Sequence, residues 1–261
     1  MNYESIKVAK QSDGVAVVTL NQPKTLNSLS KQIIDDLSSA VSDLSGDDCV
    51  KAIVLTGEGK AFCAGGDLTR FKEGFTTVSG LDYIEGIHLL IKSWTKLKKP
   101  TIAAVNGAAA GAGMSLMLMC DIAYAAETAK MGCAFINMAL IPDCGLAYYL
   151  PRAIGIQKAK ELIFTGRMLG AKEAMETGLI NQVFTDDSLM KEVLKIASEI
   201  AAKPAFALRY SKRITDMSLD VDFDSLLNIE SLMQSQLFNT EDSKEAVSAF
   251  LAKRKPVFKG K

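Results

Sequence analysis

Two short segments of small residues constrain the fold most strongly, because each lies between an expected strand and an expected helix. They are Ala64-Gly65-Gly66-Asp67-Leu68 and Gly111-Ala112-Gly113-Met114-Ser115. Small side chains let a ligand approach the main chain, and a helix N-terminus presents N–H groups without an intrahelical acceptor. If the two segments lie side by side, their N–H groups can converge on one carbonyl oxygen as an oxyanion hole. Taken singly, each segment is more simply explained by close packing of a strand on a helix.

The hydrophobic pattern predicts an α/β chain that becomes wholly helical towards its end. Strands are expected at residues 6–11, 15–20, 52–56, 101–105, 122–126, 130–133 and 179–184, and a helix over 33–44. A buried, methionine-rich helix should follow Gly113, and four more helices are expected at 189–202, 204–217, 221–238 and 242–253. The apolar faces of the last helices are too large to cover one another. They should pack on the core or on a neighbouring subunit: Leu226, Leu227, Leu232, Leu237, Phe250 and Leu251.

Composition excludes several classes of protein. The 30 basic and 30 acidic residues cancel, so no basic excess favours nucleic acid. The first residues lack the basic and apolar segments of a secretory signal, and the longest apolar run is too short to cross a bilayer. Five cysteines without a Cys-x-x-Cys pair favour a reducing, cytoplasmic location. The single histidine, His88, makes a histidine-based metal site or a Ser-His-Asp triad improbable, and we expect no metal.

Three motifs taken together resemble the crotonase (enoyl-CoA hydratase/isomerase) superfamily. They are AFCAGGDL at residues 61–68, KPTIAAVNG at 99–107 and CDI at 120–122. The resemblance extends over nearly the whole chain, from NQP at 21–23 and NSL at 27–29 to FLAKRKP at 250–256. It implies a spiral of repeated strand–strand–helix units over residues 1–200 and a helical trimerisation region over residues 201–261. It also implies trimers that often pair as hexamers, a coenzyme A (CoA) thioester as substrate, and no other cofactor.

The same resemblance assigns the binding residues by motif position. It gives the two oxyanion N–H groups to Gly66 and Ala112. An aspartate that opens a helix is ordinarily an N-cap, so capping explains Asp67 at least as well as ligand contact does. The CoA channel would be lined by Ala64, Asp67 and Leu68, with its nucleotide end near Lys24 and Leu26.

The acid and base positions depart from those of a typical hydratase. Hydration of a 2-enoyl-CoA needs one carboxylate to activate water and another to protonate the α-carbon. The resemblance places these two glutamates at Ser115 and Phe135, and neither residue can replace a carboxylate. Standard hydratase chemistry is therefore not expected.

A different carboxylate is available at Asp143, within Ile141-Pro142-Asp143-Cys144-Gly145. Similar segments occur in the ring-oxepin-forming isomerases of phenylacetate degradation, where this carboxylate is the base. The resemblance implies an isomerase in which Asp143 moves a proton from C2 to C4 of a 3-enoyl-CoA. Apolar neighbours (Phe135, Leu140 and Ile141) are expected to disfavour its ionised form. Without the resemblance, Pro-Asp-x-Gly would be an ordinary turn.

Three alternatives remain open. A hydratase could use Asp143 with an unusual partner such as Ser115 or His88. A dehalogenase or thioester hydrolase could use Asp143 and His88, since a catalytic histidine stands at the matching position in 4-chlorobenzoyl-CoA dehalogenases. Against this, Phe135 replaces the tryptophan that binds the aspartate there, and a histidine in a helix is more often a packing residue. The third alternative is a non-catalytic acyl-CoA-binding subunit.

Overall fold

The computed structural model describes residues 3–261, except for the side chain of Glu73, and contains two β-sheets. The larger sheet is parallel except for the hairpin at its edge, and the smaller sheet pairs antiparallel only at its last strand. The larger sheet has the order β1 (Ile6–Lys10), β2 (Val15–Leu20), β3 (Ala52–Gly57), β5 (Thr101–Val105), β7 (Ile122–Ala126) and β10 (Gln182–Phe184). The smaller sheet has the order β4 (Ala61–Cys63), β6 (Ala108–Ala110), β8 (Lys130–Gly132) and β9 (Met168–Gly170).

The chain advances as a spiral, because each turn gives one strand to each sheet before it enters a helix. β3 and β4 precede α2 (Leu68–Glu73) and α3 (Thr77–Thr95), and β5 and β6 precede α4 (Ala112–Leu118). β7 and β8 begin the third turn. The strand–strand–helix spiral expected from the motifs is therefore confirmed.

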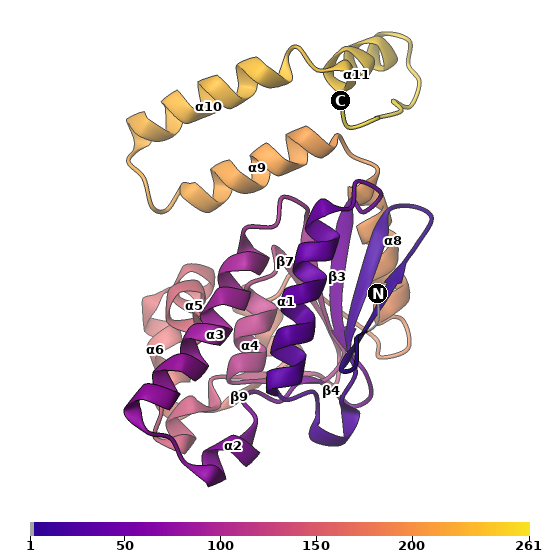
Figure 1. Cartoon of the computed structure of the whole chain (residues 1–261). Coiled ribbons are helices and arrows are strands. Elements are labelled where there is room, and N and C mark those ends of the chain that lie inside the picture. The colour runs from indigo at the N-terminus through magenta and orange to yellow at the C-terminus, as the bar shows by residue number, and fades with distance from the viewer. Residues whose placement is uncertain (1–2) are drawn as a thin grey trace.

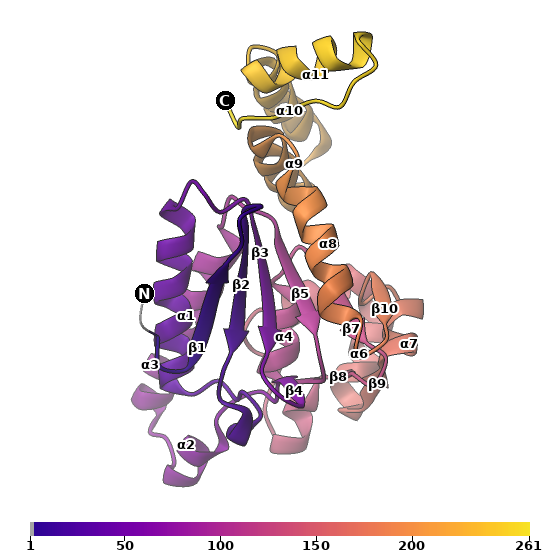
Figure 2. The ribbon, with the colours of Figure 1, turned by 90° about the vertical axis from the view of Figure 1, so that its right-hand side faces the viewer.

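Helices cover both faces of the larger sheet. In Figure 2, α1 (Lys31–Gly46) and α8 (Leu189–Ala201) lie on opposite sides of it. A parallel strand that is covered on both faces has a nearly continuous apolar sequence. In β3, all six residues are buried. The Ser30 side chain caps α1 by accepting a hydrogen bond from the N–H of Ile33.

Residues 134–176 hold elements that the hydrophobic pattern did not predict. They are the 3-10 helix η2 (Ala134–Met138), α5 (Leu146–Ile154), α6 (Ile156–Thr165), β9 and α7 (Ala171–Glu176). These elements are short, and positive-φ glycines at 145, 155 and 166 interrupt any long periodicity. The strand expected at 179–184 is also shorter, since only residues 182–184 pair with β7.

The last helices lie apart from the sheets. α9 (Ala205–Met217) and α10 (Phe223–Leu237) pack on each other above the core, and α11 (Glu241–Leu251) follows them (Figure 1). The four predicted C-terminal helices are confirmed; α8 buries its apolar face on the larger sheet, whereas the core does not cover the apolar side chains of α10 and α11. Among residues 3–261 no helix combines the length and apolarity needed to span a membrane. Large apolar side chains remain exposed on α10 and α11: Phe223, Leu227, Leu232, Val247, Phe250 and Leu251.

Candidate active site

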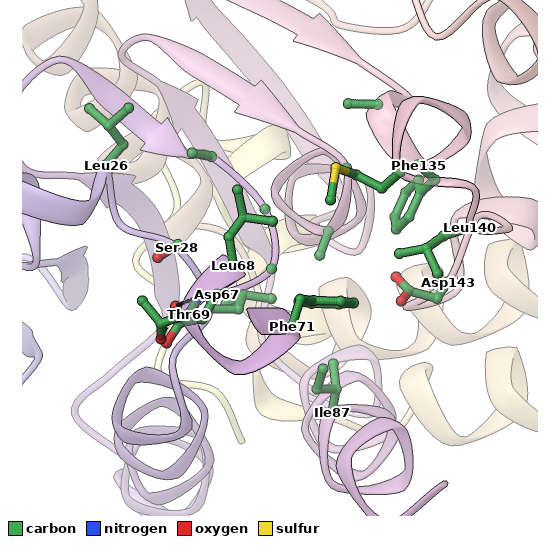
Figure 3. Close-up of a pocket in the computed structure, with 18 of the residues that line it drawn as sticks. Leu26, Ser28, Asp67, Leu68, Thr69, Phe71, Ile87, Phe135, Leu140 and Asp143 are labelled. Carbon is green, nitrogen blue, oxygen red and sulfur yellow. Dashed lines mark hydrogen bonds between the residues drawn. The ribbon is translucent and has the colours of Figure 1, made fainter. Parts of the chain in front are cut away.

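A cavity of about 490 Å³ opens where the strands β4 and β6 end. Figure 3 shows it between the loop that carries Leu26 and Ser28 on one side and Phe135, Leu140 and Asp143 on the other. Of the residues proposed from the sequence, eight line this one cavity: Leu26, Ala64, Gly66, Asp67, Leu68, Ala112, Phe135 and Asp143. Lys24, His88 and Ser115 do not line it.

The parallel pairing of β4 and β6 brings the two small-residue segments together. Ala61 pairs with Ala108 and Cys63 with Ala109, so both strands release their loops at the same edge. A Cβ added to Gly65 would lie 2.8 Å from the Ala110 oxygen and 3.7 Å from the Ala112 nitrogen. The main chain before Gly66 therefore touches the main chain at the start of α4.

Close packing at this edge requires glycine. Gly65 has φ +110° and Gly111 has φ +53°, and residues other than glycine rarely adopt such values. A Cβ on Gly113 would lie 1.9 Å from the Cys63 oxygen, so α4 could not approach β4. The simpler explanation of these segments, tight packing of a strand on a helix, is therefore confirmed.

The amides of Gly66 and Ala112 have no main-chain acceptor among residues 3–261. Ala112 is the first residue of α4, where N–H groups lack an intrahelical acceptor. The bridge between Leu29 and Gly66 uses the N–H of Leu29 and the oxygen of Gly65, 2.7 Å apart. Both amides lie in residues that line the cavity, so a ligand oxygen can accept from them.

Hydrogen bonds from Asn27 hold the loop that carries Lys24 and Leu26 against β4 and the turn before it. The buried Asn27 amide donates to the main-chain oxygens of Ala61 (2.8 Å) and Glu58 (3.0 Å). The N–H of Ala64 in turn donates to the Leu26 oxygen at 3.0 Å. Leu26 lines the cavity, and 46% of its surface is exposed. Lys24 is also exposed but does not line the cavity.

Asp67 caps a helix, as its sequence position predicts, and also lines the cavity. Its carboxylate caps α2 by accepting from the N–H of Thr69 (3.0 Å) and from the Thr69 hydroxyl (2.8 Å). The residue also lines the cavity, next to Leu68, which is 55% exposed. Leu68 and Leu26 therefore form an apolar mouth that is open to solvent.

Asp143 lies on the loop between η2 and α5, where Cys144 and Gly145 both have positive φ and turn the chain sharply. Its carboxylate lines the cavity (Figure 3), and the buried Oδ1 atom has no hydrogen-bond partner among residues 3–261. Burial raises the pKa of Asp143, although a hydrogen bond from Cys144 and the charge of His88 act in the opposite direction. A partly desolvated carboxylate of this kind is a stronger base than an exposed one.

Two expectations about the surroundings of Asp143 need correction. Ile141 is 81% exposed, because it lies on the outer side of the loop, and cannot shield the carboxylate. Ser115 is fully buried, and its hydroxyl donates to the Asp143 main-chain oxygen at 3.2 Å instead of facing the cavity. Ser115 therefore positions the loop. Phe135 (7% exposed) and Leu140 do line the cavity beside Asp143.

His88 is half-buried on α3 outside the cavity wall. It lies close enough to Asp143 for its charge to lower the pKa of that carboxyl. The same helix contributes Tyr83 and Ile87, four residues apart on one face, and α2 contributes Phe71. Sequence reasoning did not identify these three wall residues; the i, i+4 spacing of Tyr83 and Ile87 was the available signal. Among residues 3–261 no cluster of three or more His, Cys, Asp or Glu could hold a metal ion.

Comparisons with known proteins identify the family and the fold. Residues 10–261 match the family model described as "Enoyl-CoA hydratase/isomerase". The chain is 38% identical to the 1,2-epoxyphenylacetyl-CoA isomerase of Escherichia coli, over 95% of its own length and 96% of the relative's. It is 35% identical to the short-chain-enoyl-CoA hydratase of Clostridium acetobutylicum, over 95% of each. The solved structure of an enoyl-CoA hydratase from Bacillus anthracis has a TM-score of 0.95 at 34% identity, covering 99% of this chain and 100% of that one.

Proposed function

The chain belongs to the enoyl-CoA hydratase/isomerase family, and we propose that it isomerises 3-enoyl-CoA thioesters to 2-enoyl-CoA thioesters. The single observation that carries the proposal is the carboxylate of Asp143. It lines the cavity that also contains the amides of Gly66 and Ala112, and its pKa is raised by burial. A carbonyl oxygen held by two amides and a base beside it are the two requirements of proton transfer next to a thioester.

The proposed reaction uses these groups in sequence. The Asp143 carboxylate takes a proton from C2, and the electron pair moves into the thioester carbonyl to give a dienolate. The amides of Gly66 and Ala112 stabilise the negative oxygen, which is where most of the catalytic advantage arises. Asp143 then returns the proton at C4, and the double bond lies between C2 and C3. No atom is gained or lost.

The residues at the hydratase positions support isomerisation over hydration. Ser115 and Phe135 stand where typical hydratases of this family carry glutamates, and neither can accept or supply a proton as a carboxylate does. The hydroxyl of Ser115 is already bonded to the main chain of Asp143. One carboxylate suffices for an isomerase, because the same group takes and returns the proton.

Hydration is the second candidate. It is favoured by the relatives, most of which are named hydratases; examples are a probable enoyl-CoA hydratase of Rhizobium meliloti, 39% identical over 99% of each chain, and the short-chain-enoyl-CoA hydratase of Clostridium acetobutylicum. In that case Asp143 would activate water, and a second group such as His88 would be needed as its partner. Isomerisation needs no second group, so we prefer it.

For the substrate and the assembly we propose an acyl-CoA thioester and a homotrimer or dimer of trimers. The apolar mouth at Leu26 and Leu68 supports a channel for the pantetheine arm. The uncovered apolar side chains of α10 and α11, of which Phe250 is 83% exposed, support an interface between copies of the chain. No cofactor besides the thioester is needed for the proposed proton transfer.

The proposal is tested by Asp143→Asn with 3-hexenoyl-CoA, following the absorbance of the conjugated product. We expect kcat to fall by about 10²- to 10⁴-fold, the usual share of a general base. Affinity for the non-reacting hexanoyl-CoA should change less than about threefold, because the amide keeps the shape of the carboxylate. Asp216→Asn is the matched control, since desolvation also raises the pKa of the Asp216 carboxyl but Asp216 does not line the cavity. Undiminished turnover in Asp143→Asn, or hydration of crotonyl-CoA as fast as isomerisation, would contradict the assignment.

A further inference from the structure

The hydroxyl of Tyr83 has no role in the reaction proposed above. Its Oη atom is buried and has no hydrogen-bond partner among residues 3–261. Buried hydroxyl groups are nearly always paired, so an unpaired one calls for an explanation such as a missing ligand. The Oδ1 atom of Asp143 is also buried and unpaired, and both residues line the same cavity.

The aromatic ring of Tyr83 is held in place by its neighbours. It packs against Phe75 with ring centroids 5.5 Å apart, and Phe75 packs edge-on against Phe71 at 5.4 Å. The Arg70 guanidinium lies 4.8 Å from the centre of the Tyr83 ring, as a cation over an aromatic face. The position of the hydroxyl is thus fixed by the fold.

The hydroxyl remains a donor, and Tyr83 lies close enough to Asp143 for that carboxylate to raise its pKa. Burial, and then the neighbouring Cys144 and Asp143, raise the pKa of Tyr83 to about 12, while Arg70 acts in the opposite direction. The phenol is therefore protonated at neutral pH and can donate a hydrogen bond. Tyr83 lies one helical turn before Ile87, which Figure 3 shows at the Asp143 side of the cavity.

We propose that Tyr83 determines specificity by donating a hydrogen bond to a neutral oxygen on the acyl group of the substrate, beyond the thioester. A plain hydrocarbon chain would leave this donor unpaired in an apolar wall, whereas a hydroxyl, carbonyl or ether oxygen would pair it. A carboxylate is a poor occupant, because the Asp143 carboxylate lines the same cavity. The preferred substrates are thus oxygen-bearing acyl-CoA thioesters. This inference rests on the proposed acyl-CoA substrate, but not on the choice of isomerase over hydratase.

The test measures binding of saturated thioesters, which cannot isomerise or hydrate. Hexanoyl-CoA, 4-oxohexanoyl-CoA, 5-oxohexanoyl-CoA and 6-hydroxyhexanoyl-CoA are titrated calorimetrically into the wild type and into Tyr83→Phe. We expect at least one oxygenated ester to bind the wild type about fivefold more tightly than hexanoyl-CoA, the usual net value of one hydrogen bond. Tyr83→Phe should reduce that ratio to about one and leave the Kd of hexanoyl-CoA within about twofold.

Tyr124→Phe serves as the matched control, because Tyr124 is a buried tyrosine of β7 that does not line the cavity. It should keep the full ratio between oxygenated and plain esters. The inference is overturned if no oxygenated ester exceeds hexanoyl-CoA by twofold in the wild type, or if Tyr83→Phe weakens all four esters equally. Failure of all four esters to bind would overturn the proposed acyl-CoA substrate itself, and this inference with it.

Discussion

The variant Gly65→Ala tests whether the close packing of the two small-residue loops is needed for the proposed oxyanion hole as well as for folding. Gly65 has φ +110°, and a Cβ there would lie 2.8 Å from the Ala110 main-chain oxygen. Ordinary van der Waals contact begins at 3.4 Å, so the two loops would have to move apart by about 0.6 Å. The backbone strain adds a cost of about 1–3 kcal/mol to folding.

The displacement is large for an oxyanion hole. Donors must lie about 2.7–3.1 Å from the developing oxyanion, so a shift of about 0.6 Å takes one amide out of range. Loss of one such donor typically lowers kcat by about 10²- to 10³-fold. We therefore expect kcat for Gly65→Ala to fall by about 10²-fold, with a lowered melting temperature but a folded protein.

The assay combines initial-rate kinetics on 3-hexenoyl-CoA with thermal unfolding. Gly155→Ala is the control, because Gly155 also has positive φ (+81°) but has open space where its Cβ would go. It should lose stability through the backbone strain alone, by about 2–4 °C for each kcal/mol, without loss of kcat. The reasoning is refuted if Gly65→Ala keeps kcat within twofold of the wild type, or if both variants lose activity equally.

Two further predictions concern charge and assembly. Because burial raises the pKa of Asp143 in the folded state, the wild type should lose stability as pH rises from the ordinary carboxyl pKa through this raised value. Asp143→Asn should therefore melt at a higher temperature than the wild type at neutral pH, and the gap should close in acid; a gap that does not depend on pH would contradict this. Phe250→Asp, at a side chain 83% exposed on α11, should dissociate the proposed trimer to monomers in sedimentation velocity, whereas an unchanged mass would exclude this face as the interface.

The sequence predicted the scaffold well, because parallel strands and amphipathic helices carry strong periodicity. The continuous apolar run of β3 and the four C-terminal helices are examples. It failed between residues 134 and 176, where helices of five to ten residues are separated by glycines with positive φ. Their start and end points depend on tertiary packing, which periodicity does not encode.

The sequence predicted only those cavity residues whose main-chain contacts require small side chains. Gly65 and Gly113 are required by close contacts with Ala110 and Cys63, and that requirement is visible as a run of small residues. Tyr83 and Ile87 could not be assigned to the cavity wall in this way, because a tyrosine and an isoleucine four residues apart are found on the core face of many helices. The direction of the Ser115 hydroxyl was likewise unpredictable, since it depends on where the Asp143 loop passes.

The contacts of Ser115 bear on the choice between isomerisation and hydration in this family. The amides proposed for the oxyanion hole follow the ends of β4 and β6, whereas Asp143 comes from a separate loop after η2. The Ser115 hydroxyl is fully buried and donates to the main-chain oxygen of Asp143 at 3.2 Å. An ionised glutamate has no proton to donate to that oxygen, so Ser115→Glu would remove the hydrogen bond that holds the Asp143 loop. A hydratase-type glutamate at this position would therefore also loosen the carboxylate on which the proposed isomerisation depends.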